Sequence, residues 1–104
     1  VPFKSGFTLI DTNSIIRCEA HSNYTKMICD NNETYIVSKT LKRVENEYLR
    51  EDIFVRTHQS HLINVKFVNL KSIENSAVKM MNGDQVPISR SRRDSLFNQL
   101  KKLT

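Results

Sequence analysis

The sequence has 104 residues, of which 38% are hydrophobic and 26% are charged, and it carries a formal net charge of +5. This length accommodates one domain with its own core, so we expect residues 1–104 to form a single unit. The sequence contains no membrane-length apolar run and no signal-peptide pattern, which predicts a cytoplasmic protein without membrane contact. Because the chain begins at Val1 rather than methionine, we expect a second domain upstream.

The basic charge is concentrated in the second half of the chain. Residues 1–52 contain seven Lys and Arg against eight Asp and Glu, whereas residues 53–104 contain nine against three. Such a concentration favours a polyanionic partner, because neutralising phosphates releases condensed counterions. Surface charge that keeps a protein soluble gives the same composition, and composition alone does not separate the two explanations.

Short segments of alternating apolar and β-branched residues run through most of the chain. They predict strands over residues 7–10, 15–19, 24–29, 34–38, 53–57, 67–74, 77–81 and 85–88. Asn82-Gly83 supplies the positive φ values of a tight hairpin turn, and the polar residues 30–33 predict a second turn. Pro87 cannot donate to a ladder, so its strand is expected at an edge or a bulge. The pattern favours an antiparallel, mainly β domain.

Two helices interrupt the strands. Residues 38–45 begin with cap-forming side chains and place Leu41 and Val44 near one face, which predicts a short middle helix. Ser91 and Asp94 resemble a capping box at the start of a C-terminal helix. The apolar stripe of that helix comprises Leu96, Phe97, Leu100 and Leu103. We interpret the stripe as core.

The cysteines and histidines do not favour catalysis. Cys18 and Cys29 lie in predicted strands without companions at metal-ligand spacing, so we expect reduced core thiols. His58 and His61 are three residues apart, and in an extended segment their side chains would point to opposite faces. We therefore expect no enzyme activity, metal or cofactor. A metal-dependent enzyme using these two histidines and His21 is kept as a further hypothesis.

Three polar segments, residues 20–26, 56–64 and 89–93, separate the predicted strands. The second is the densest, because it places basic and amide side chains between two apolar flanks. Asn, Gln and Arg side chains can pair with base edges, and a helix start offers N–H groups to phosphate. A polar loop is the commoner explanation for any one segment, but the three together favour a binding surface. Its best base-reading candidates are Gln59 and Arg90.

Several polar residues in these segments have structural alternatives. Asn64 is flanked by apolar residues and fits a buried amide that bonds the backbone. His58 can fix its loop by a hydrogen bond, and Arg56 can pair with either a phosphate or a carboxylate. Tyr24 fits a core edge or a phosphate contact.

With these residues in view, the chain resembles the LytTR DNA-binding domain of bacterial response regulators. The resemblance covers nearly the whole chain. It rests on the segments Ile16-Arg17-Cys18-Glu19-Ala20, Asn23-Tyr24, Phe54-Val55-Arg56-Thr57-His58-Gln59-Ser60-His61-Leu62-Ile63-Asn64 and Asn82-Gly83-Asp84-Gln85-Val86-Pro87-Ile88-Ser89-Arg90. His61 departs from the Tyr or Phe common at its position in the family.

The resemblance implies antiparallel strands in small stacked sheets with a short middle helix and a C-terminal helix. It also implies that loops, rather than a recognition helix, enter successive major grooves of promoter DNA. In many members a dimer binds repeated sites, and an upstream regulatory domain, often of a two-component system, controls the output. The family's base-contacting positions correspond here to the Asn23–Tyr24 loop, Gln59 and Arg90, and its pattern makes His58 an orienting element.

We therefore expect sequence-specific binding of double-stranded DNA by a transcription regulator. Bases would be read by Asn23, Gln59 and Arg90. The duplex would be positioned by Lys26, Arg56, Arg92 and Arg93, and the DNA-contacting set also includes Tyr24, His58 and Ser60. The alternative is a protein-interaction module whose basic loops or strand edge receive an acidic partner domain.

Overall fold

The structure, a computed structural model, describes residues 2–3, 6–7, 9–74 and 76–102. Its strands are β1 (Pro2–Phe3), β2 (Gly6–Phe7), β3 (Ile15–His21), β4 (Tyr24–Cys29), β5 (Thr34–Val37), β6 (Phe54–His58), β7 (His61–Asn64), β8 (Val68–Ile73), β9 (Ala77–Met80) and β10 (Gln85–Pro87). The α-helices are α1 (Leu41–Tyr48) and α2 (Arg93–Lys101), and the 3-10 turns are η1 (Thr12–Ser14), η2 (Val65–Phe67) and η3 (Arg90–Arg92). Among these elements no helix is long and apolar enough to cross a membrane.

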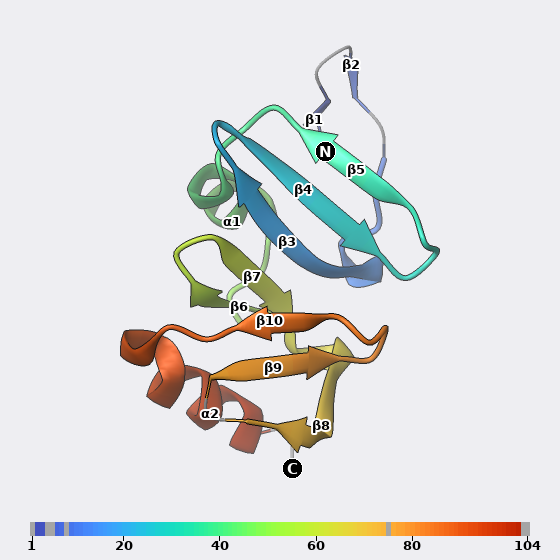
Figure 1. Cartoon of the computed structure of the whole chain (residues 1–104). Helices are drawn as coiled ribbons and strands as arrows, with labels where there is room; N and C mark the ends of the chain where they lie inside the picture. The colour runs from blue at the N-terminus through green and yellow to red at the C-terminus, as the bar shows by residue number, and fades with distance from the viewer. Residues whose placement is uncertain (1, 4–5, 8, 75, 103–104) are drawn as a thin grey trace.

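The strands form small antiparallel sheets, as Figure 1 shows. The largest has the order β5-β4-β3-β7-β6, the second has the order β10-β9-β8, and β1 pairs with β2. All described pairings are antiparallel. The predicted fold class, a mainly β domain with a short middle helix and a C-terminal helix, is therefore confirmed.

The five-stranded sheet lies between two hydrophobic clusters. The first joins its strands to α1 and contains Ile15, Cys18, Met27, Cys29, Val37, Leu41, Val44, Leu49, Ile53, Phe54 and Leu62. The second joins its other face to the three-stranded sheet and α2, and contains Ile16, Ile63, Val65, Val68, Val78, Met80, Val86, Ile88, Leu96 and Leu100. Adjacent residues such as Leu62 and Ile63 thus enter different clusters, because successive side chains of a strand point to opposite faces.

Strand β7, like the short β1, was not predicted from the sequence. It pairs with both β3 and β6, and Leu62 and Ile63 are completely buried. A strand buried on both faces shows consecutive apolar residues instead of alternation, and here only two such residues stand between His61 and Asn64. The predicted strand over residues 7–10 is also wrong, since β2 ends at Phe7 and residues 9 and 10 are irregular, while Thr8 lies outside the described residues.

The turn predictions are mostly confirmed. Asn31 Oδ1 accepts a bond from the backbone N of Glu33, as the polar turn after β4 required. Pro87 lies on β10, an edge strand. In the turn after β9 only Gly83 has positive φ, at 94°, and Met80 N donates to Asp84 O at 2.8 Å. This hairpin loop is therefore longer than the predicted two-residue Asn-Gly turn.

The two α-helices begin differently. Thr40 caps α1 as predicted, with its Oγ1 accepting from Arg43 N. The capping box predicted around Ser91 and Asp94 is wrong, because α2 begins at Arg93 after η3 and its cap residue makes no side-chain cap bond in the described structure. Leu96 and Leu100 are buried and Phe97 packs beside them, which confirms the stripe as core. Leu103 lies outside the described residues.

Both cysteines are buried and free, as expected of core thiols. Burial, reinforced by the neighbouring Cys29, raises the pKa of the Cys18 thiol to about 12. Burial also raises the pKa of Cys29. Because the thiolate is the reactive form, both groups are chemically inert at neutral pH.

Asn64 is a fully buried amide at the end of β7. Its Nδ2 donates to Ile15 O at 3.0 Å, and its Oδ1 accepts from Lys66 N at 2.9 Å. The predicted structural role of this residue is thus confirmed. The two bonds join the start of β3 to the η2 turn.

We predict that Asn64→Ala lowers the free energy of unfolding by about 1–3 kcal/mol, because it leaves the buried carbonyl of Ile15 and the partly buried N–H of Lys66 without this partner. Urea unfolding followed by circular dichroism measures the change. Asn98→Ala on the exposed face of α2 is the control, expected within about 0.5 kcal/mol of wild type. Equal stability of the two variants would contradict the role of the buried amide.

Candidate nucleic-acid interface

The three polar segments come together along one edge of the molecule, on the left in Figure 1. They are the β3–β4 turn, the β6–β7 turn and the η3 segment. Ala20 N donates to Ser60 O at 2.8 Å, which joins the first to the second, and Ser89 N donates to Thr57 O at 2.7 Å, which joins the second to the third. Backbone bonds therefore fix the relative positions of the three, and we refer to them together as the turn edge.

The first part of the turn edge is a two-residue turn between His21 and Tyr24, which are register partners. Ser22 adopts a φ of 56° and Asn23 is exposed beside it. The ring of Tyr24 stacks on that of His21, with centroids 5.5 Å apart and planes 13° from parallel. Tyr24 is thus a surface residue of the turn rather than part of either core.

Lys26 lies farther along β4 than the turn. It is the register partner of Glu19 on β3, it is half-buried, and its charge acts on Asp84. The structure therefore places Lys26 on the sheet face beside acidic groups, apart from the turn that carries Asn23.

The second part is the β6–β7 turn, formed by Gln59 and Ser60. Most of the polar segment 56–64 is paired strand, and only these two residues connect the strands. Gln59 is exposed at the tip. His58 Nδ1 accepts from Ser60 N at 3.1 Å, which confirms the predicted bracing role of His58.

The hairpin also corrects the expected orientation of two histidines. His58 and His61 face each other as register partners instead of pointing to opposite faces, and their rings meet edge to face at 5.6 Å. The turn between them reverses the chain, whereas the prediction treated the segment as one extended strand. Within the described ranges, no three His, Cys, Asp or Glu side chains are arranged to hold a metal ion.

Arg56 pairs with a carboxylate, which is one of its two predicted partners. Its Nε lies 3.3 Å from Glu45 Oε1 of α1, and its Nη1 donates to Gln59 O at 2.9 Å. The Arg56 side chain is only 17% exposed. The guanidinium is therefore held against the protein, where it is less available to a phosphate than an exposed arginine.

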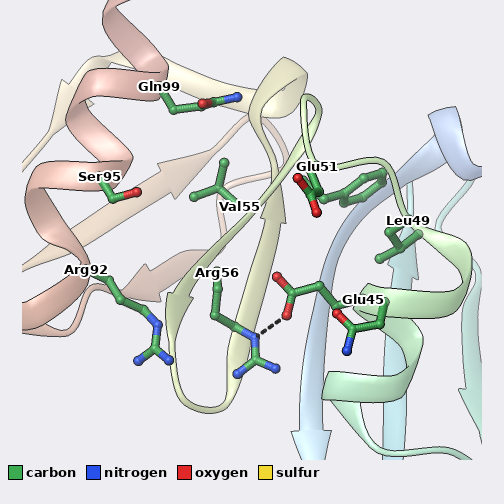
Figure 2. Close-up of a pocket in the computed structure, with 10 residues that line it drawn as sticks. Glu45, Leu49, Glu51, Val55, Arg56, Arg92, Ser95 and Gln99 are labelled. Atoms are coloured by element: carbon green, nitrogen blue, oxygen red, sulfur yellow. Dashed lines mark ion pairs between the residues drawn. The ribbon is translucent and has the colours of Figure 1, made fainter.

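The third part is the η3 segment, which carries Arg90 and Arg92 and is followed directly by Arg93, the first residue of α2. Arg90 is exposed, whereas Arg92 and Arg93 are half-buried. Arg92 lies near Arg56 in a groove between α1 and α2, as Figure 2 shows. The hydroxyl of Ser89 is buried and has no hydrogen-bond partner among the described residues.

A network of charges that sequence reasoning missed lies behind the turn edge. Arg17 contacts Glu19 at 3.2 Å and Asp84 at 2.9 Å, and Glu19 also hydrogen-bonds His21. Partial burial opposes ionisation of Glu19, yet the bonds and charges of His21 and Arg17 hold its pKa below the usual value. The Arg17 bond likewise lowers the pKa of Asp84. The spacing of Arg17, Glu19 and His21 was the available signal, since alternate strand residues share a face.

The family of the chain follows from comparison with known proteins. Residues 5–101 match the family described as the LytTr DNA-binding domain. The chain belongs to the LytTR family. It is accordingly a DNA-binding domain of the kind found in transcription regulation.

The relatives of this LytTR domain agree with that assignment. The heme-containing CO-sensing transcriptional regulators RcoM 2 and RcoM 1 of Paraburkholderia xenovorans (strain LB400) are 31% and 29% identical to it over 97 residues. Each match covers 89% of this chain and 36% of the relative. The chain therefore spans little more than a third of these curated relatives.

A solved structure shares the fold. It is the LytTr DNA-binding domain of a Bacillus cereus protein described as a methyl-accepting/DNA response regulator, with a TM-score of 0.74 and 24% identity. The match covers 96% of this chain and 92% of that one. Since the whole fold superposes, the sheets and helices described above are those of a LytTR domain.

The LytTR domain is predicted to lose stability as the pH falls below neutral because of His61. Burial lowers the pKa of this imidazole. The negative charge of Glu19 opposes that shift, whereas the positive charge of Arg17 adds to it. The unfolded chain gains a proton at this position near pH ~6.5 while the folded chain stays neutral. The stability contribution is therefore complete above that pH and decreases below it.

Unfolding measured from pH 7 to pH 5.5 tests this expectation. His61→Phe removes the titrating group, so its free energy of unfolding should fall less steeply over that range than that of wild type. His21 and His58 are present in both proteins, so the difference between the two slopes reports the effect of His61. Parallel slopes would show that His61 does not contribute.

Proposed function

We propose that this LytTR domain binds double-stranded DNA sequence-specifically, with the turn edge inserted into successive major grooves. The observation that carries the proposal is the alignment of three turns whose tips expose Asn23, Gln59 and Arg90, joined by the backbone bonds Ala20–Ser60 and Ser89–Thr57. Amide and guanidinium groups of this kind can form paired hydrogen bonds with adenine and guanine edges. A rigid spacing between three such readers suits a defined base sequence.

Phosphate contacts would position the duplex on this edge. Arg92 and Arg93 adjoin Arg90, and the Ser60 hydroxyl and Tyr24 adjoin the other two readers. Such contacts fix register without reading sequence. Lys26 would contribute mainly through its charge, since it lies on the sheet face, and His58 would orient the second turn.

The biological setting that we propose is the output domain of a bacterial transcription regulator of the response-regulator type. A partner domain would control when the turn edge meets promoter DNA, and two copies could occupy repeated sites. The family is one of DNA-binding domains, and we propose no catalytic role for the histidines. Selection of bound duplexes from a random DNA pool tests the proposal, and a pool that yields no consensus would overturn it.

Arg90→Ala is expected to relax base preference. Loss of a bidentate contact should weaken binding to the selected duplex by about 1–3 kcal/mol and change binding to random DNA much less. Competition gel shifts with both duplexes measure the difference. Arg50→Ala is the matched control, because Arg50 is exposed and precedes β6, at the end opposite to the Gln59 turn. An equal loss on both duplexes would contradict base reading by Arg90.

Binding should weaken steeply with salt because phosphates are neutralised. Each neutralised phosphate contributes a slope of about −0.9 in log affinity against log salt. Arg93→Gln should reduce the slope by about one contact and lower affinity for selected and random duplexes alike. Fluorescence anisotropy over a salt series provides the slopes. If the affinity of the wild type for DNA did not change with salt, the result would argue against phosphate contacts and favour the alternative, in which the domain docks an acidic protein partner.

A further inference from the structure

Glu45 of α1 and Arg56 of β6 form a charge pair across the groove in Figure 2. Their side chains are 32% and 17% exposed, so the pair is shielded from water more than an ordinary surface salt bridge. Arg56 Nε is buried and has no well-aligned hydrogen bond among the described residues. The Glu45 carboxylate, 3.3 Å away, therefore compensates its charge.

The same guanidinium holds the backbone of the β6–β7 turn. Its Nη1 donates to Gln59 O at 2.9 Å. The neighbouring peptide groups are fixed as well, since Ser60 N donates to His58 Nδ1 and Ser60 O accepts from Ala20 N. The bond from Arg56 also links the turn to a helix outside its own sheet, because the same guanidinium pairs with Glu45 of α1.

We propose that Glu45 and Arg56 are positioning residues that set the orientation of Gln59 for base reading. The inference rests on the proposed function. Neither residue needs to contact a base: Glu45 orients the guanidinium, the guanidinium fixes the Gln59 carbonyl, and the fixed peptide aims the exposed amide. Paired hydrogen bonds to a base edge tolerate little misorientation, so loss of the pair reduces discrimination between sequences.

The pair has a second effect on DNA binding. While Glu45 neutralises Arg56, the guanidinium is restrained from reaching a phosphate. Glu45→Gln keeps the shape of the side chain and removes its charge. The released Arg56 should strengthen binding to random DNA and steepen the salt slope by about one phosphate contact. A purely structural role for Glu45 would not increase that slope.

The test compares Glu45→Gln with Glu47→Gln. Glu47 lies on the same helix and pairs with Arg43 at 3.1 Å and Lys39 at 3.7 Å, both outside the β6–β7 hairpin. Both variants remove one negative charge from α1. Glu45→Gln should lower the ratio of the affinity for selected duplexes to that for random duplexes roughly tenfold, because it weakens one base contact without removing it. Glu47→Gln should leave this ratio unchanged. An unchanged ratio in both variants would overturn the inference.

A double-mutant cycle with Gln59→Ala shows whether Glu45 acts through Gln59. In the Gln59→Ala background, Glu45→Gln should have little further effect on the affinity ratio, since the reader is already absent. A full additional loss in that background would overturn the positioning role.

Amide hydrogen exchange provides a readout without DNA. Glu45→Gln should accelerate exchange of the Ser60 amide several-fold, while Glu47→Gln leaves it unchanged and the amides of β3 keep their protection in both. Unchanged Ser60 exchange would overturn the positioning role even if DNA is read. A different outcome would be that Glu45→Gln accelerates Ser60 exchange but the wild type does not distinguish the two duplexes. That result would overturn the proposed function, and with it the base-reading part of this inference.

Discussion

Burial of β7 on both faces is the constraint on which the rest of the structure depends. Leu62 enters the cluster with α1 and Ile63 enters the cluster with α2, so four residues connect both cores. The amide of Asn64 then fixes the end of the strand to Ile15 and to the η2 turn, which leads into the three-stranded sheet. Because β7 cannot shift without disturbing both cores, the β6–β7 turn at its other end has a fixed place.

The polar network behind that turn complements this arrangement. Arg17 contacts Glu19 on its own strand and Asp84 in the β9–β10 hairpin of the three-stranded sheet. These contacts link the five-stranded and three-stranded sheets through charge as well as through apolar packing. Both carboxylates therefore remain ionised but compensated. If DNA binds at the turn edge as proposed, these acidic side chains would repel its phosphates, and Arg17 would limit that repulsion without being exposed there.

The sequence predicted the features whose signals are local. Alternation identified β3 and β4, and the apolar flanks of Asn64 indicated a buried amide. Strand β7 was missed because its two apolar residues, flanked by two polar ones, are too few to give a periodic signal. The capping box failed because a 3-10 turn displaced the start of α2. The Arg56–Glu45 and Arg17–Asp84 pairs depend on how separate elements pack, which spacing along the chain does not encode.

Under the proposed function, the way the turn edge is held would also separate the choice of target sequence from the stability of the fold. The bonds from Ala20 N to Ser60 O and from Ser89 N to Thr57 O use peptide groups, which almost any residue supplies. Side chains at the tips are not needed for these bonds, so substituting them leaves the turns in place and, under the proposed function, would change which bases are read. Arg56 and His58 differ, because they hold the second turn through side-chain atoms. Changes there, or at Glu45, should affect how accurately that turn reads a base, whichever residue occupies its tip.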